Sequence, residues 1–195
     1  GMRWVKYKQV IENFFSLSIL NALNVLLPLV TLPYMLHVVG KANYGAYSYV
    51  YAVVQYVILF STYGFNFSAT KQISQCRDDK EKVSKIYNAV TASKTLIALS
   101  LSVLLLLCAK LVFKDGVGTL MFVYGLGMVI GDVLTPIWLF QGMEKMKYMT
   151  IVNASSKILF TILIFIVVRA SEDYQLLILL NSCGYLLAGV LSLIL

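Results

Sequence analysis

The stretch NASSKILFTILIFIVV, residues 153–168, places one lysine ahead of eleven residues of which only Thr161 is polar. A run of this composition is typical of a membrane-crossing helix, because about 20 predominantly apolar residues are needed to span the hydrocarbon core. Lys157 is then a charge inside the bilayer, where insertion scales give a lysine a cost of about 2.5–3.5 kcal/mol. The lysine therefore needs either a neutralising partner or a function.

Five further runs of the same kind occur along the chain. The six runs are residues 13–36, 44–66, 86–108, 117–141, 148–168 and 175–195. They are rich in Leu, Val, Ile and aromatic residues, do not alternate, and exceed the roughly 10 residues of a barrel strand, which predicts helices. The first run lacks a small-residue cleavage site, so we expect it to remain in the protein as the first span.

The composition supports the same interpretation. The chain is 59% hydrophobic and 13% charged, with a mean hydropathy of +0.81, whereas a soluble domain is about 25% charged. The six runs leave no room for a soluble domain. We expect an all-α fold, a polytopic membrane bundle of six transmembrane helices over residues 1–195.

The basic residues predict how the chain threads the membrane. Ten of the 16 Lys and Arg residues fall in the N-terminal segment or in the second and fourth connections, and four fall on the other side. The ten are Arg3, Lys6, Lys8, Lys71, Arg77, Lys80, Lys82, Lys85, Lys145 and Lys147, and the four are Lys41, Lys110, Lys114 and Arg169. Short loops rich in Lys and Arg stay in the cytoplasm, so both ends are expected there. The net charge of +7 follows from this bias and suits anionic lipid head groups, so no nucleic acid is expected as a partner.

Residues that carry chemistry are scarce. Three widely spaced cysteines and one histidine indicate neither a disulfide framework nor a metal site. The chain shows no nucleotide-binding glycine loop, acidic metal cluster or nucleophile elbow. We expect no catalytic residue, no cofactor and no metal, which leaves transport driven by a gradient as a compatible function.

Three ionisable residues share one layer inside the predicted spans. Lys94 lies eight residues into the third span and Lys157 nine into the fifth, about 12–14 Å deep at 1.5 Å per residue. Asp132 lies nine residues before Gln141 and reaches the same level. Asp132 either neutralises one lysine in a pair that only joins helices, or the surplus positive charge marks a cavity or pathway. The cavity is the favoured interpretation.

Polar residues of four spans are expected to line this cavity. In the first span Ser18, Asn21, Asn24, Pro28 and Thr31 recur at spacings of three and four, which places them on one helical face. Pro28 and Pro33 are expected to bend that span. The candidate residues for the substrate or the cavity wall are Lys157, Lys94, Asn21, Asn24, Gln55, Tyr51, Tyr56 and Asn153. The tyrosines could stack on a sugar, although an aromatic stripe is also typical of packing.

Two segments resemble a known family. The segments are LPYMLHVVGKANYGAYSYVYAVVQYVILFSTYGFNFSATKQISQCRDD, residues 32–79, and WLFQGMEKMKYMTIVNASSK, residues 138–157. They resemble the bacterial oligosaccharide flippases of the polysaccharide transporter family, O-antigen type carriers in the multidrug/oligosaccharidyl-lipid/polysaccharide exporter superfamily. The resemblance implies a carrier with two six-helix lobes that moves an undecaprenyl-diphosphate-linked glycan from the cytoplasmic to the periplasmic leaflet of the bacterial inner membrane. Such transport serves O-antigen, lipopolysaccharide or other surface polysaccharide assembly.

The resemblance also implies partners and residue roles. This chain would be an N-terminal lobe, with a missing C-terminal lobe, membrane lipid, and polysaccharide polymerase and chain-length proteins as partners. Lys94 and Lys157 would meet the diphosphate or an acidic glycan, and Asp132 would tune them or couple to a cation. The cytoplasmic entrance would contain Lys71, Arg77 and Asp79.

Two other functions remain open. One is a cation-coupled exporter of amphipathic drugs, with Asp132 as the ion site. The other is a non-transporting scaffold whose buried charges serve only helix association. Abundant lysine and a single deep carboxylate favour the anionic substrate.

Overall fold

The computed structural model describes residues 2–62, 64–113 and 116–195. The elements are α1 (Met2–Val39), α2 (Lys41–Thr62), α3 (Phe65–Gln75), α4 (Lys80–Val112), α5 (Val117–Leu134), α6 (Ile137–Gly142), α7 (Met146–Val167), the 3-10 helix η1 (Ser171–Asp173) and α8 (Tyr174–Ile194). No strand occurs in these three ranges, and the predicted all-α fold is confirmed. Lys114, one of the four basic residues assigned to the outer side, lies outside the described residues.

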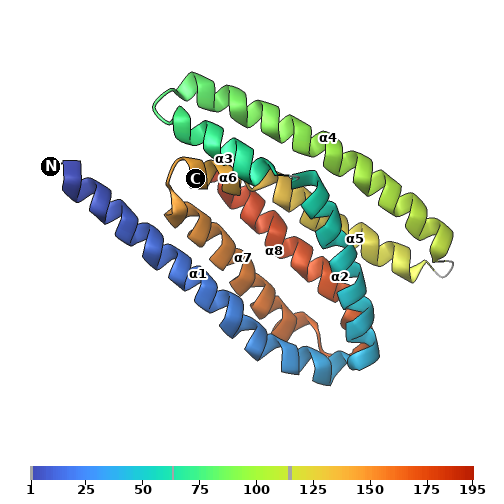
Figure 1. Cartoon of the computed structure of the whole chain (residues 1–195). Coiled ribbons are helices and arrows are strands. Elements are labelled where there is room, and N and C mark those ends of the chain that lie inside the picture. Colours follow the sequence, from blue (N-terminus) through green and yellow to red (C-terminus); the bar gives the residue numbers. More distant parts are fainter. Residues whose placement is uncertain (1, 63, 114–115) are drawn as a thin grey trace.

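Six stretches of the described chain are long and apolar enough to cross a membrane. They are α1, α2 with α3, α4, α5 with α6, α7, and η1 with α8. Figure 1 shows the N- and C-termini at the same end of the bundle, beside the turn from α3 to α4 and the turn from α6 to α7. We call this the terminal end. Its position in the cytoplasm, inferred from the basic residues, stays a prediction.

Turns and breaks follow from glycine and proline. At the other end of the bundle α1 and α2 are joined by Gly40 alone, whose φ of +84° lies in the left-handed region that glycine adopts without strain. The expected span 117–141 is divided between α5 and α6, because Pro136 has no N–H and would clash with the Asp132 carbonyl in a continuous helix. That carbonyl accepts from the Thr135 N–H at 3.1 Å instead. By contrast, α1 continues to Val39 with Pro28 and Pro33 inside it.

The tightest packing is the seam between α5 and α8. Gly127 faces Ser182, and Gly131 faces the backbone of Tyr185, where an added Cβ would lie 2.4 Å from the carbonyl carbon. From the other helix, Gly189 approaches Leu134 in the same way. Small residues let helix backbones approach closely. The small-residue pair of the fourth span therefore packs against the sixth, and α5 and α8 form the centre of the bundle (Figure 1).

A second core lies at the terminal end. Trp138 of α6 is 1% exposed and packs with Ala69 and Ile73 of α3 and Val90 of α4. The Trp138 carbonyl accepts a hydrogen bond from Thr70 Oγ1 at 3.2 Å. This core joins the two short helices to the first turns of α4.

Candidate functional site

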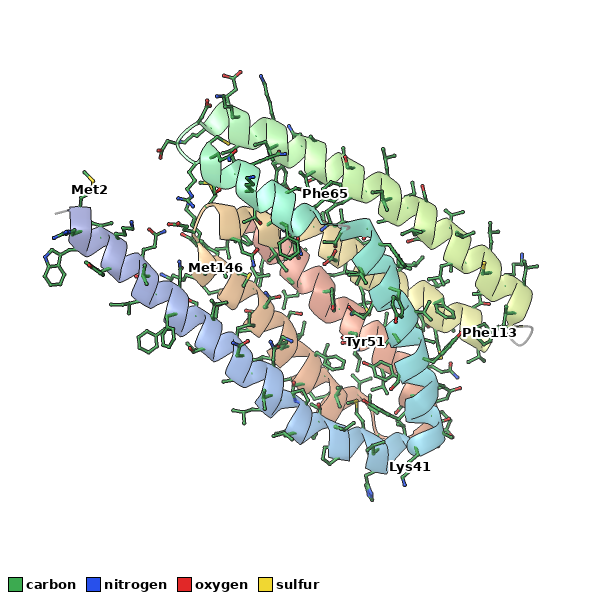
Figure 2. The ribbon with its side chains drawn as sticks, in the orientation of Figure 1. Met2, Lys41, Tyr51, Phe65, Phe113 and Met146 are labelled. Atoms are coloured by element: carbon green, nitrogen blue, oxygen red, sulfur yellow. The ribbon has the colours of Figure 1, made fainter. Side chains whose placement is uncertain are left out.

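A cavity of about 430 Å³ opens between α1, α2, α5, α7 and α8. Tyr51 lies on the side of α2 that faces α7 and α8 (Figure 2). The cavity is lined by apolar residues and by a large polar set. Its polar members are Asn24, Thr31, Tyr44, Tyr47, Ser48, Tyr51, Asp132, Thr135, Asn153, Ser156, Lys157, Thr161, Asn181 and Tyr185.

Lys157 lies in the wall that α7 contributes. Asn153, Lys157 and Thr161 are spaced by four residues, which puts them on one face of the helix, and all three line the cavity. The opposite face of α7 carries Ile158 and Ile162, which are exposed and suited to lipid. Within residues 2–62, 64–113 and 116–195, Lys157 forms no ion pair. The cavity therefore contains a partly buried ammonium group without a protein counter-ion.

The other two ionisable residues of the layer form a pair. Lys94 of α4 and Asp132 of α5 are 3.5 Å apart between Nζ and Oδ2, with side chains 3% and 17% exposed. Asp132 lines the cavity, whereas Lys94 lies behind it and is absent from the described lining. The break after α5 places the carboxylate here, because Asp132 lies in the last turn before Thr135 and Pro136. Both alternatives from the sequence are thus present together: an internal pair and a surplus positive charge.

Tyrosines form the wall opposite α7. The ring centroids of Tyr44 and Tyr47 are 5.7 Å apart, and those of Tyr47 and Tyr51 are 5.9 Å apart. Asn181 Nδ2 donates a hydrogen bond to the Tyr47 hydroxyl. Gln55 Nε2 donates to the Tyr185 hydroxyl at 3.0 Å. The hydroxyls of this wall are therefore fixed by amides of α2 and α8.

The structure separates the predicted residues of α2. Tyr51 lines the cavity, and Gln55 supports a residue that lines it. Tyr56 is 61% exposed on the outside of the bundle, so it is not brought to the cavity. Sequence reasoning missed Tyr47 as a wall residue, although its spacings of three and four from Tyr44 and Tyr51 are a helical-face signal that could have found it.

The polar face of α1 is only partly turned to the cavity. Asn24, Pro28 and Thr31 line it, but Asn21 is exposed and outside the described lining. Pro28 has no N–H, so the Asn24 carbonyl four residues earlier lacks its helical donor. Asn24 therefore brings an amide side chain to this wall.

The three predicted entrance residues lie at the terminal end. Arg77 Nη2 is 2.9 Å from Glu144 Oε1, and its Nε donates to the Gly142 carbonyl at 2.6 Å. Asp79 caps α4 by accepting from the Lys82 N–H at 3.2 Å. Lys71 is exposed on α3. Arg77 and Asp79 thus have local structural partners, and an entrance role for all three stays a prediction.

Six helices of membrane-spanning length around a polar cavity define a multi-pass membrane protein. No group of three or more His, Cys, Asp or Glu residues suited to a metal occurs in the part of the chain that the structure describes. The profile of the family described as polysaccharide biosynthesis protein matches residues 10–195. The chain belongs to this family, as the resemblance predicted.

Two curated relatives cover nearly the same region. A protein of Escherichia coli (strain K12) named "Putative O-antigen transporter" is 33% identical over 182 residues, which are 93% of this chain and 44% of the relative. A protein of the same name from Shigella dysenteriae is 28% identical over 182 residues, 93% of this chain and 45% of the relative. The chain thus spans less than half the length of these relatives. No solved structure gives a significant match.

Proposed function

We propose that this chain is one half of a carrier, not an enzyme, that flips an undecaprenyl-diphosphate-linked glycan from the cytoplasmic to the periplasmic leaflet of the bacterial inner membrane. The glycan is destined for O-antigen or another surface polysaccharide. The family and the names of the two relatives support polysaccharide transport. The observation that carries the proposal is Lys157, a cation that forms no ion pair with any residue the structure describes, in a polar cavity between membrane-spanning helices.

The cavity chemistry suits a phosphate-bearing glycan. An ammonium group inside a bilayer is expensive unless an anion neutralises it, so a passing diphosphate would gain a strong partner and relieve that cost. Asn24 and Asn153 line the same cavity and supply amide donors and acceptors for sugar hydroxyls. The rings of Tyr44 and Tyr51 offer flat apolar surfaces against which a sugar can pack. The prenyl chain would stay in lipid, beside the exposed faces of the helices.

In this proposal the two buried lysines differ in role. Lys157 contacts the substrate, and Lys94 acts through Asp132 by neutralising it, 3.5 Å away. The pair leaves the cavity with one net positive charge. A neutral pair beside a free cation attracts an anion without trapping it as strongly as two free cations would.

The rest of the carrier is part of the proposal. Because the chain spans less than half of its relatives, we infer that a second lobe supplies a facing wall for the cavity. Both ends of this chain would be cytoplasmic, and Lys71, Arg77 and Asp79 would border the entrance. Polymerase and chain-length proteins would act on the glycan after it has crossed.

The test is Lys157→Gln in the natural full-length carrier. We expect at least a tenfold loss of surface O-antigen, accumulation of lipid-linked glycan in the inner membrane and an unchanged amount of carrier. Lys147→Gln is the matched control, because Lys147 is exposed on the same helix and does not line the cavity. Lys157→Arg should retain part of the activity. Normal surface polysaccharide in Lys157→Gln would overturn the proposal.

The cavity position of Asp132 favours a second candidate, a cation-coupled exporter of amphipathic drugs. A carboxylate open to the cavity could bind a proton or a sodium ion. Export of cationic dyes by the full-length protein, lost in the stability-balanced double variant Lys94→Met/Asp132→Asn and retained in Lys157→Gln, would select this candidate over the flippase.

A further inference from the structure

A second cavity of about 430 Å³ lies at the terminal end of the bundle. It is bordered by the start of α4, by α6 and the turn that follows it, and by the last turn of α8. It shares no lining residue with the cavity that contains Lys157. Of its described lining residues, Arg77 alone has been given a role so far, at the proposed entrance.

The border of this second cavity is positively charged. Arg77, Lys80 and Lys145 come from three separate segments, and none of the described lining residues is acidic. Glu144 neutralises Arg77 at 2.9 Å. Lys80 and Lys145 form no ion pair within the described ranges. Two uncompensated ammonium groups therefore border one concave surface.

Hydroxyl groups and an apolar floor complete the cavity. Ser84, Tyr87, Tyr148 and Ser192 line it and can donate to phosphate oxygens. Lys145 Nζ lies 6.0 Å from the centroid of the Tyr148 ring, which places that cation above an aromatic face. We call the apolar members of the lining the floor. They are Val83, Pro136, Leu139, Phe140, Met143, Leu193 and Leu195.

We propose that this second cavity binds one acidic phospholipid, with its phosphate between Lys80 and Lys145 and the start of its acyl chains on the apolar floor. Lys80 is the first residue of α4 and lies six residues before the apolar run 86–108, where we expect lipid head groups. Basic pockets between membrane helices are suited to anionic head groups. A free phosphate would pair with the two lysines but leave the apolar floor uncovered. The presence of both lysines and floor in one cavity therefore favours a lipid. The bound lipid bridges α4 to the turn between α6 and α7.

The experiment titrates the full-length protein, purified in mild detergent, with dioleoylphosphatidylglycerol or dioleoylphosphatidylcholine and counts bound lipids by native mass spectrometry. The cavity variant is Lys80→Gln/Lys145→Gln. The matched control is Lys82→Gln/Lys147→Gln, which removes the same charge from neighbouring exposed positions outside the cavity. We expect phosphatidylglycerol to bind about tenfold more weakly to the cavity variant, because each lysine near an anionic head group contributes to the binding free energy. The control should stay within twofold of the unmodified protein.

Three results would overturn the proposal. One is equal phosphatidylglycerol binding by the cavity variant and its control. Another is equally tight binding of phosphatidylcholine, which would make the floor alone responsible. The last is displacement of the lipid by millimolar inorganic phosphate, which would indicate a site for free phosphate. A photoreactive phosphatidylglycerol on the unmodified protein gives a readout independent of folding: we expect labelling at Leu139 or Tyr148, and its absence counts against the site.

Discussion

The seam between α5 and α8 and the wall formed by α1 and α7 lie on two sides of one cavity and are built in opposite ways. At the seam, Gly131 and Gly189 leave no space for a methyl group. At the wall, Asn153 and Lys157 face a space of about 430 Å³. Small residues let the backbones of α5 and α8 approach closely at the seam. At the wall, long polar residues face an open space. From this comparison we expect the bundle to have a rigid support and an adaptable surface.

The buried charges follow the same division. Lys94 lies on the packed side, 3% exposed, with Asp132 at 3.5 Å. Lys157 lies on the open side and forms no ion pair among the described residues. The packed side satisfies its own charge, and the open side leaves one charge available to a ligand. Three substitutions break or sharpen this comparison.

The largest effect is expected for Asp132→Asn, which leaves Lys94 buried without a counter-ion. Removing one partner of a buried pair costs about 3–5 kcal/mol, so the free energy of unfolding in mixed micelles should fall by roughly that amount. The double variant Lys94→Met/Asp132→Asn should recover most of the loss. Lys157→Met removes a charge that has no partner and should not lower the stability. A loss below about 1 kcal/mol in Asp132→Asn, or no recovery in the double variant, would contradict the structural pair.

A smaller effect is expected for Gly131→Ala at the seam. The new Cβ would meet the carbonyl carbon and oxygen of Tyr185, both at 2.4 Å, and backbone atoms cannot swing aside as a side chain can. Overpacking of this kind costs about 1–3 kcal/mol. Gly45→Ala in α2 is the control, because its Cβ would have nothing within 4 Å and alanine stabilises a helix by about 0.5–1 kcal/mol. Equal changes in unfolding free energy at both positions would show that α5 and α8 are not so close.

The level of the charged residues along their helices could be predicted from the sequence. The side of each helix on which a residue would face the cavity could not. The rise of 1.5 Å per residue put Lys94 and Asp132 at one level, and their 3.5 Å contact confirms it. The side of each helix that faces the cavity is harder to predict. A membrane helix is apolar on both its lipid face and its packed face, so the hydrophobic periodicity that orients a soluble helix is weak. The structure brings Tyr51 to the cavity and leaves Tyr56 exposed, although the two are five residues apart in α2.

The order of the spans followed from their lengths, but the partners of each span did not. Apolar runs predicted six crossings. The spacing of Gly127 and Gly131 permits a close helix neighbour but does not say which one. The structure identifies α8. Asn181 and Tyr185 reach the cavity only because α8 packs there, and no pattern near them in the sequence carries that information.

The smallest effect is expected for a substitution that removes one of the hydrogen bonds between α1 and the ends of α7. Tyr34 of α1 donates a hydrogen bond to the Val168 carbonyl, just beyond α7, at 2.7 Å. At the terminal end, Gln9 Nε2 donates to the Glu144 carbonyl at 2.9 Å. These two bonds attach α1 to either end of α7, and the cavity opens between them. The wall therefore has one hydrogen bond at each end beside side-chain packing such as that of Tyr34 on Phe165, whose ring centroids are 4.6 Å apart, whereas the seam is joined by close backbone packing.

Tyr34→Phe should cost about 0.5–1.5 kcal/mol, the usual net contribution of one hydrogen bond. Because the bond lies at the end of α7, hydrogen exchange should accelerate at Val168 and the preceding turn while the amides of α5 and α8 stay protected. Tyr49→Phe is the control, since Tyr49 is 59% exposed and should change neither quantity. Faster exchange across the seam as well would mean that wall and seam open together, and the division between a rigid support and an adaptable surface would then be wrong.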